Sequence, residues 1–202
     1  MRKYLLLSLM LLSPALSAQA PQPSSEEPLA LLVQAGAAME SLDCTFVQTR
    51  TSAMMAEPLV SRGRMSYRRP DYLLWEYLSP ASLSLTLDGT RITLIRDGNT
   101  IPADGSGSRM FRELGRMISR TVSGEALSDG SFDTRLQVSD GEWVVMLIPL
   151  RKDVKRMWSS LILHYDPVRR CAVRIEIEEG SDERTAVEFS QIRINGKSSN
   201  AL

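Results

Sequence analysis

Residues 63–80, which read GRMSYRRPDYLLWEYLSP, indicate the class of the fold. In their first half, Met65 and Tyr67 alternate with two arginines and a serine. An apolar side chain at every second position is typical of an antiparallel strand with one buried face and one solvent-facing side. Pro70 suits the end of such a strand, because proline cannot donate a hydrogen bond to a neighbouring strand. The stretch therefore predicts a half-buried strand that ends in a turn.

Similar strands are predicted on both sides of this stretch. One begins at Phe46, and Leu83, Leu85 and Leu87 again alternate with polar residues. Turn-forming sequences rich in Asp, Gly, Asn and Pro separate the predicted strands, as they do in hairpins. We therefore predict an up-and-down antiparallel sheet. The further predicted strands are 92–95, 132–138, 143–150, 160–165, 173–178 and 186–194.

Two segments instead repeat apolar residues every three or four positions. The first, residues 29–42, opens behind Pro28 and two glutamates, which suits the N-terminus of a helix. The second lies within residues 106–127 and ends near Ser123-Gly124; it follows a glycine-containing loop and interrupts the strands. A helix beside a sheet is either plain core or a lid over a ligand, and its spacing leaves both interpretations open. The predicted fold class is α+β, mostly β with a few helices.

The N-terminus has the features of a secretory signal peptide. Arg2 and Lys3 precede an apolar run at 4–12, which is too short to span a bilayer. Ala18-Gln19-Ala20 offers the small-x-small pattern for cleavage after residue 20, and the lipobox cysteine of a lipid-anchored protein is missing there. We therefore expect a soluble periplasmic protein. The predicted divisions are a signal peptide at 1–20, a flexible lead-in at 21–28 and a single domain at 29–202.

Charge and cysteine content argue against several classes of function. The sequence has 24 basic and 24 acidic residues, and two of the basic ones belong to the predicted signal peptide. A near-neutral chain with scattered charges lacks the basic surface that nucleic-acid binding needs. Cys44 and Cys171 either form a long-range disulfide, which an exported protein can keep, or remain two buried thiols. Since the sequence has neither a C-x-x-C motif nor a Cys/His cluster, we expect no metal and no cofactor.

The stretch that opens this section also resembles a known family. The strings Phe46-x-Gln48, Gly63-x-Met65, Arg69-Pro70-Asp71, Leu74-Trp75-Glu76-Tyr77, Pro80 and Leu87-Asp88-Gly89 are similar to the N-terminal half of the LolA family. Its members are periplasmic carriers that take lipoproteins from an inner-membrane transporter to an outer-membrane acceptor. The resemblance implies an unclosed antiparallel β-barrel, a half-pipe, whose concave face is capped by helices and holds acyl chains. It also implies three partners: a lipoprotein or other acylated cargo, an inner-membrane lipoprotein-releasing transporter and an outer-membrane acceptor.

The resemblance gives Arg69 the role of a latch. It matches the family arginine that hydrogen-bonds backbone groups of the capping helices and keeps the empty cavity shut. A guanidinium suits this role because it stays charged and offers five donors in a fixed fork. Without the resemblance, Arg69 would be interpreted as a surface arginine at a strand end. We expect the cavity or lid to be lined by Phe46, Met65, Trp75, Leu85, Met110, Phe111, Leu114, Met117, Trp143 and Val145.

Two other classes of function, an enzyme and an interaction module, differ from a carrier in what the sequence should contain. An enzyme has little support, because His164 is the single histidine and neither a G-x-S-x-G nor an H-E-x-x-H motif accompanies it. The alternative that stays open is a β-rich interaction module of the cell envelope that senses lipids or lipoproteins. For a carrier we expect a monomer, because it has to diffuse between two membranes.

Overall fold

The computed structural model describes residues 26–102, 106–139, 141–180 and 182–198, and only the backbone of 106–111, 139, 197 and 198. The predicted signal peptide and residues 21–25 of the lead-in lie outside the described residues. The helices are α1 (Glu26–Ala37), α2 (Ser106–Val122), the 3-10 helix η1 (Glu125–Leu127) and α3 (Lys152–Lys155). The strands are β1 (Ser41–Ser52), β2 (Leu59–Arg68), β3 (Tyr72–Ser79), β4 (Leu83–Asp88), β5 (Arg91–Arg96), β6 (Asn99–Ile101), β7 (Phe132–Ser139), β8 (Glu142–Pro149), β9 (Ser160–Asp166), β10 (Cys171–Glu179), β11 (Glu183–Ile194) and β12 (Lys197–Ser198).

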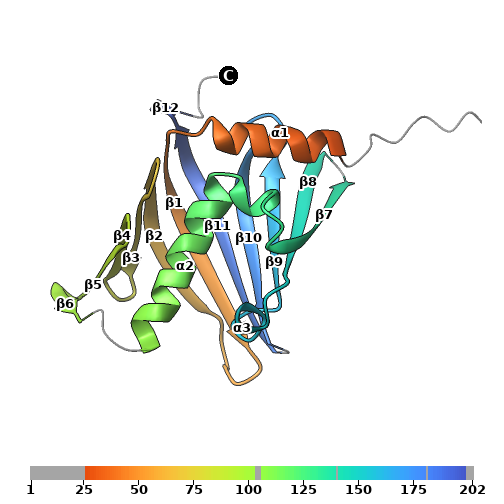
Figure 1. The fold of residues 1–202 in the computed structure, drawn as a ribbon. Coiled ribbons are helices and arrows are strands. Elements are labelled where there is room, and N and C mark those ends of the chain that lie inside the picture. Colours follow the sequence, from red (N-terminus) through yellow and green to blue (C-terminus); the bar gives the residue numbers. More distant parts are fainter. Residues whose placement is uncertain (1–25, 103–105, 140, 181, 199–202) are drawn as a thin grey trace, which may run out of the picture.

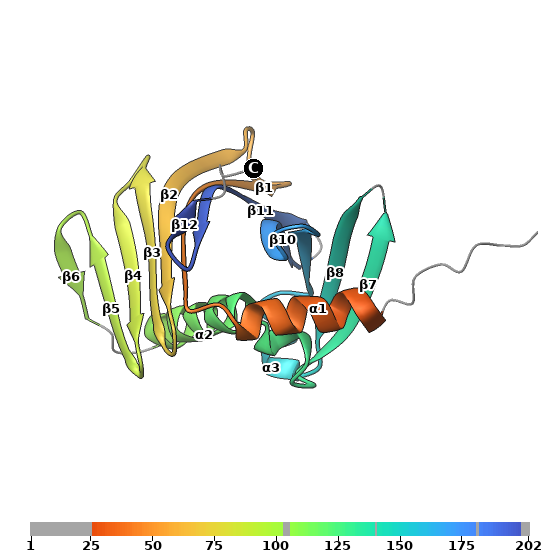
Figure 2. The same cartoon turned by 90° about the horizontal axis from the view of Figure 1, so that it is seen from above.

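All strands belong to one antiparallel sheet with the order β6-β5-β4-β3-β2-β1-β11-β10-β9-β8-β7, and β12 pairs with β11. Strands that follow one another in the chain pair as hairpins from β1 to β6 and again from β7 to β11. The pairing of β1 with β11 joins these two series. Because β6 and β7 end the order and do not pair with each other in the described part, the sheet stays open, and Figure 2 shows it arched like a half-pipe. The predicted fold class is confirmed.

The helices cover the concave side of the arched sheet. α2 follows β6 at one edge, crosses the opening of the half-pipe and leads through η1 to β7 at the other edge (Figures 1 and 2). α2 packs against β3, β4 and η1, while α1 lies across one end of the half-pipe and contacts η1 and β10 (Figure 1). The helix that links the two edges is thus the part of the chain that shuts the open side.

The buried core consists of two clusters. The first lies on β1 to β5 and includes Ile118 of α2, Cys171 of β10, and Val187 and Ile192 of β11. The second lies on β8 and β9 beneath α1 and η1. Among the fully buried side chains are Phe46, Tyr67 and Leu73 of the first cluster and Leu32, Val145, Leu147, Leu161 and Leu163 of the second.

The observed boundaries differ from the predicted ones at the first helix. It ends at Ala37 instead of residue 42, and β1 already begins at Ser41. The three-residue step from Met39 to Leu42 continues the helical spacing by coincidence, because Leu42 starts the buried face of β1 that continues at Cys44 and Phe46. The predicted end of the second helix near Ser123-Gly124 agrees with the end of α2 at Val122, and Gly124, whose φ of 76° lies in the left-handed region, separates α2 from η1. The short strands β6 and β12 were not predicted.

Candidate functional site: an apolar cavity beneath the helices

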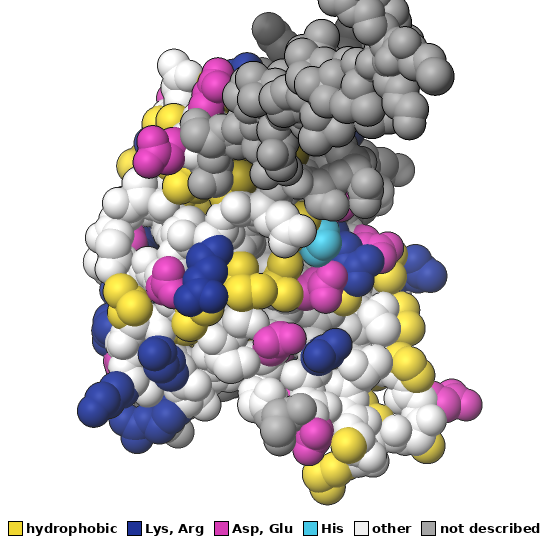
Figure 3. Space-filling view, turned by 90° about the vertical axis from the view of Figure 1, so that its right-hand side faces the viewer, with side chains coloured by type: hydrophobic (Ala, Val, Ile, Leu, Met, Phe, Trp, Pro, Cys, Tyr) yellow, Lys and Arg dark blue, Asp and Glu magenta, His cyan; other side chains and the backbone are white. Residues whose placement is uncertain are grey.

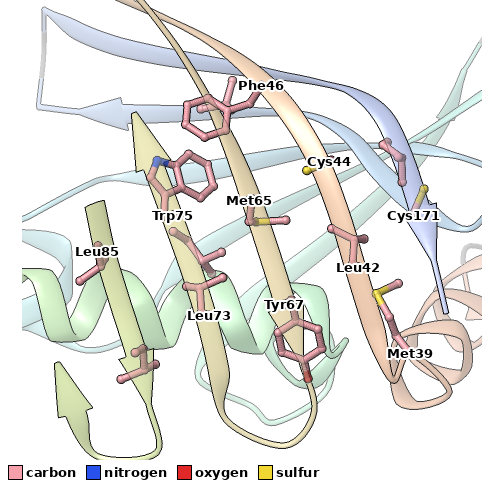
Figure 4. Close-up of a cluster of buried hydrophobic side chains, with 14 of the residues drawn as sticks. Met39, Leu42, Cys44, Phe46, Met65, Tyr67, Leu73, Trp75, Leu85 and Cys171 are labelled. Carbon is pink, nitrogen blue, oxygen red and sulfur yellow. The ribbon is translucent and has the colours of Figure 1, made fainter. Parts of the chain in front are cut away.

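A narrow cavity of about 180 Å³ lies between the concave face of the sheet and the two capping helices. The sheet contributes apolar side chains of β1, β2, β3, β10 and β11, and α1 closes one end through Leu32 and Gly36. Figure 4 shows part of this wall, with β1, β2 and β3 side by side. The lining from the lid consists of Leu114, Met117, Ile118, Thr121 and Val122 of α2.

An aromatic group on β1 and β3 shapes one side of the cavity. Phe46 is buried and stacks on Trp75 with ring centroids 4.3 Å apart, and the edge of Tyr77 meets Phe46 at 5.5 Å. Gly63 leaves room for this stack: a Cβ atom there would lie 2.4 Å from Cζ of Phe46 and 2.1 Å from the carbonyl oxygen of Glu76. The register of β2 and β3 shifts at the same residue. Gly63 therefore combines close packing with an irregularity in the pairing of β2 and β3.

Arg69 follows β2 and reaches the C-terminal end of α1. Its Nε donates a hydrogen bond to the carbonyl oxygen of Met39 at 3.1 Å, and Nη2 donates to those of Gly36 at 3.0 Å and Ala37 at 2.9 Å. The last carbonyls of a helix lack partners within it and carry its partial negative charge, so a guanidinium is well suited to them. These bonds join the end of α1 to the β2–β3 hairpin, so of the two capping helices Arg69 bonds to α1 and not to α2.

Asn195 holds the next residues of the chain and was missed in the sequence. Its Oδ1 accepts hydrogen bonds from the backbone N–H groups of Glu40 at 2.8 Å and Ser41 at 3.0 Å, and its Nδ2 donates to the carbonyl oxygen of Ala38 at 3.2 Å. Arg69 and Asn195 together fix the path from α1 into β1. The pair Asn195-Gly196 signals a turn, but a contact over 155 positions leaves no local pattern.

The two capping helices meet through a pair of glycines. A Cβ atom on Gly36 would lie 2.6 Å from the backbone nitrogen of Gly124, which follows the turn at the end of α2. Only glycine permits so close an approach, and Gly124 also needs a positive φ. Since Gly36 is also an acceptor of Arg69, the arginine, the end of α1 and the end of α2 form one continuous contact.

The cavity becomes polar at the end that lies away from α1. Along β1 its lining changes from Leu42 and Cys44 to Gln48 and Arg50. Oη of Tyr77 donates a hydrogen bond to Oε1 of Gln48 at 2.8 Å, and burial raises the pKa of this phenol. Arg50 pairs with Glu179 of β10, which also lines this end. Arg170, which directly precedes β10, also lines the cavity, so a charged side chain is present in the lining outside this end as well.

Cys44 and Cys171 both line the cavity, and in the structure they are free, buried thiols (Figure 4). Of the two alternatives left open by the sequence, the structure has the unbridged one. Cys44 lies on β1 and Cys171 on β10, and β11 runs between these strands. Burial, with smaller effects from Asp43 and Cys171, raises the pKa of Cys44 to about 12, and burial raises that of Cys171 to about 11. Neither thiol is therefore suited to nucleophilic chemistry at neutral pH.

The other residues expected to line the cavity or lid fall into three groups. Met65, Trp75, Leu114 and Met117 line the cavity. Phe46 lies behind Trp75, and Leu85 is buried close to Gly115 of α2, so it packs beneath the lid. The side chains of Met110 and Phe111 lie outside the described residues. Val145 belongs to the second core cluster and Trp143 packs against it, and neither side chain lines the cavity. The structure adds Ile175, Ile177, Val187 and Phe189 to the lining.

The histidine lies on the face of β9 that points away from the cavity. Its Nδ1 is 3.4 Å from a carboxylate oxygen of Glu142, and its Nε2 is 3.2 Å from one of Glu176. Figure 3 shows it, in cyan, on a face where charges of both signs occur. In the described part, no group of three or more His, Cys, Asp or Glu side chains is placed to hold a metal ion. Among the described helices, none has the length and apolar character needed to cross a membrane.

Comparisons with known proteins identify part of the chain. Residues 37–101 match the family model for the outer membrane lipoprotein carrier protein LolA. None of the curated proteins that were compared matches the sequence. Three solved structures illustrate the similarity in fold. A LolA superfamily protein from Nitrosomonas europaea has 11% sequence identity and a TM-score of 0.45, with 85% of this chain and 93% of that chain covered.

The other two structures are similarly distant. The lipoprotein LppX from Mycobacterium tuberculosis has 13% identity and a TM-score of 0.43, with 85% of this chain and 96% of that chain covered. The MucA/MucB complex from Pseudomonas aeruginosa has 14% identity and a TM-score of 0.45, with 87% of this chain and 59% of that chain covered. The resemblance seen in the sequence is confirmed by the family match: from residue 37 to residue 101, this chain is LolA-like.

Proposed function

We propose that this chain is a periplasmic carrier that binds the acyl chains of lipoproteins, or of another acylated molecule, and shuttles them from the inner to the outer membrane. The observation that carries the proposal is the cavity, whose walls on β1, β10, β11 and α2 are mainly apolar. Apolar side chains that face an enclosed space favour an apolar ligand. The LolA-like match over residues 37–101 supports the same class of cargo.

The size of the cavity supports a mechanism in which α2 moves. At about 180 Å³ it is smaller than the roughly 300–1,000 Å³ that is usual for ligand pockets. Cargo would therefore enter only if α2 moves away from the sheet. Leu114, Met117 and Ile118 would then exchange contacts with strands for contacts with acyl chains, so their apolar surface stays covered in both states. Cargo and lid compete for the same wall.

The bonds of Arg69 suit a latch that acts on α2 through α1. Arg69 holds the end of α1, and Gly36 of that end touches Gly124 beyond α2. In this role Arg69 stabilises the empty, closed protein, and cargo has to overcome that stabilisation. An inner-membrane lipoprotein-releasing transporter would supply the cargo, and an outer-membrane acceptor would remove it.

Bound lipid on the exported protein tests this function. Protein isolated from the periplasmic fraction should begin at Pro21, and solvent extraction followed by mass spectrometry should release acylated species. Ile177→Trp would fill the cavity, and overpacking of about 1–3 kcal/mol corresponds to a loss of bound species of about 5- to 150-fold. Val138→Trp is the matched control, because Val138 on β7 is 42% exposed. A folded wild-type protein without acylated species, or equal loading of both variants, would contradict the proposal.

A lipid- or lipoprotein-sensing interaction module would use the same cavity but keep its ligand. Transfer distinguishes the two functions. A carrier loaded with a fluorescent acyl probe should pass it to acceptor vesicles, whereas a sensor should retain the probe and change its affinity for a protein partner.

A further inference from the structure

The polar end of the cavity is lined by Arg50 and Glu179, and Glu183, which is not a lining residue, pairs with the same guanidinium. Nη2 of Arg50 lies 2.7 Å from Oε2 of Glu183 and 3.6 Å from Oε2 of Glu179. Thr185, which is buried, donates a hydrogen bond from Oγ1 to Oε1 of Glu179 at 3.0 Å. The three charged side chains are 32–39% exposed, so this end of the cavity meets solvent. The cluster has a net charge of minus one.

This arrangement lies where a head group of a bound amphiphile would lie. Leu42 is next to α1 and Gln48 is six positions further along β1, a distance of roughly 20 Å in a strand. An acyl chain that lies along the apolar part with its polar end away from α1 places that end beside Arg50 and Glu179. Nε of Arg50 is buried and has no hydrogen-bond partner among the described residues. A ligand oxygen would supply the missing acceptor.

We infer that this cluster is a head-group site that selects acyl amphiphiles without a negative charge, with an ester or hydroxyl oxygen as acceptor for Arg50 and a hydroxyl or amine donor for Glu179. The inference rests on the proposed function and names the chemistry of its cargo. A free carboxylate or phosphate head group meets two carboxylates and a guanidinium that is already paired with both of them. A glyceryl ester instead offers an ester oxygen that can accept a hydrogen bond from Arg50 and a hydroxyl that can donate one to Glu179.

Three probes with the same chain test this selection: monododecanoylglycerol, dodecanol and dodecanoate, each measured by displacement of a fluorescent apolar probe. We expect the glyceryl ester to bind about fivefold more tightly than dodecanoate, the upper limit for one partly exposed charge contact, with dodecanol between them. The double variant Glu179→Gln, Glu183→Gln should reduce this preference to about twofold or less. Glu188→Gln is the control, because Glu188 lies on the other face of β11 and pairs with Arg174.

The outcomes separate this inference from the proposed function. If all three probes bind equally well, or if the double variant keeps the wild-type preference while its thermal melting shows an intact fold, the head-group site is refuted and the carrier function stands. If none of the probes displaces the fluorescent ligand, both fail.

Discussion

Replacement of Arg69 by leucine is the sharpest test of how the cavity is kept shut. The guanidinium makes three hydrogen bonds to carbonyl oxygens of the α1 terminus, at 2.9 to 3.1 Å. A hydrogen bond from a charged group contributes about 1.5–3 kcal/mol, but one side chain shared by three acceptors does not give three times that value. The side chain is 30% exposed, so solvent weakens the bonds further. We therefore expect a loss of about 2–4 kcal/mol in the docking of α1, or about 30- to 700-fold in its opening equilibrium.

Hydrogen–deuterium exchange measures this opening directly. In Arg69→Leu, the amides of α1 should lose protection by about that factor, and a loaded acyl probe should be released with altered kinetics because α1 meets α2 at Gly36. Asn195 still holds Glu40 and Ser41, so β1 should stay protected. Arg68→Leu is the matched control, since Arg68 is 46% exposed and bonds to Asp43 and to the carbonyl oxygen of Tyr67, which both lie outside α1. If the two variants exchange alike, Arg69 is not a latch.

Two further predictions concern the glycine contact and the cysteines. Gly36→Ala should destabilise the protein by about 1–3 kcal/mol, because its Cβ would lie 2.6 Å from the backbone of Gly124. Gly115→Ala is the control and should be neutral or stabilising, because its Cβ would lie 3.7 Å from Leu87. Thermal melts compare the two variants, and equal melting temperatures would contradict a close contact between Gly36 and Gly124. Cys44 and Cys171 should resist a thiol reagent at pH 8 until the protein unfolds, and two thiols should then react. Since burial raises both pKa values, unfolded thiols ionise first and stability should fall as the pH rises above about 9; a mass lower by two hydrogens would contradict free thiols.

Periodicity predicted the sheet well because each strand has one face in the core or cavity and one in solvent. In β10, Ile175 and Ile177 line the cavity, while Arg174 and Glu176 form an ion pair on the other face. Such an alternation is readable in any single strand. The prediction that Trp143 and Val145 line the cavity was wrong. An apolar face of β8 has the same sequence pattern whether it packs against a ligand or against a second core layer.

The contacts that control the helices could not be predicted in the same way. Arg69 and its acceptor Gly36 are 33 positions apart, and Asn195 and Glu40 are 155 apart. No periodicity links such pairs, so only the family resemblance pointed to Arg69, and nothing pointed to Asn195 or to the contact of Gly36 with Gly124. The polar end of the cavity was missed for a related reason: Arg50, Glu179 and Glu183 are ordinary strand residues until β1, β10 and β11 are placed side by side.

The extent of the family match has a structural explanation. Residues 37–101 cover β1 to β6, one side of the sheet, which carries Arg69, Gly63 and the stack of Phe46 on Trp75. Each of these positions requires a particular side chain, because a Cβ at Gly63 would strike Phe46 and only a guanidinium offers this fork of donors. The strands β9 to β11 line the cavity with Ile175, Ile177 and Val187. At these positions any apolar side chain of suitable volume can fill the same space. Under the proposed function, β9 to β11 are therefore the strands that can vary with the cargo while the bonds of Arg69 stay the same, and the charged ends of β10 and β11 lie there.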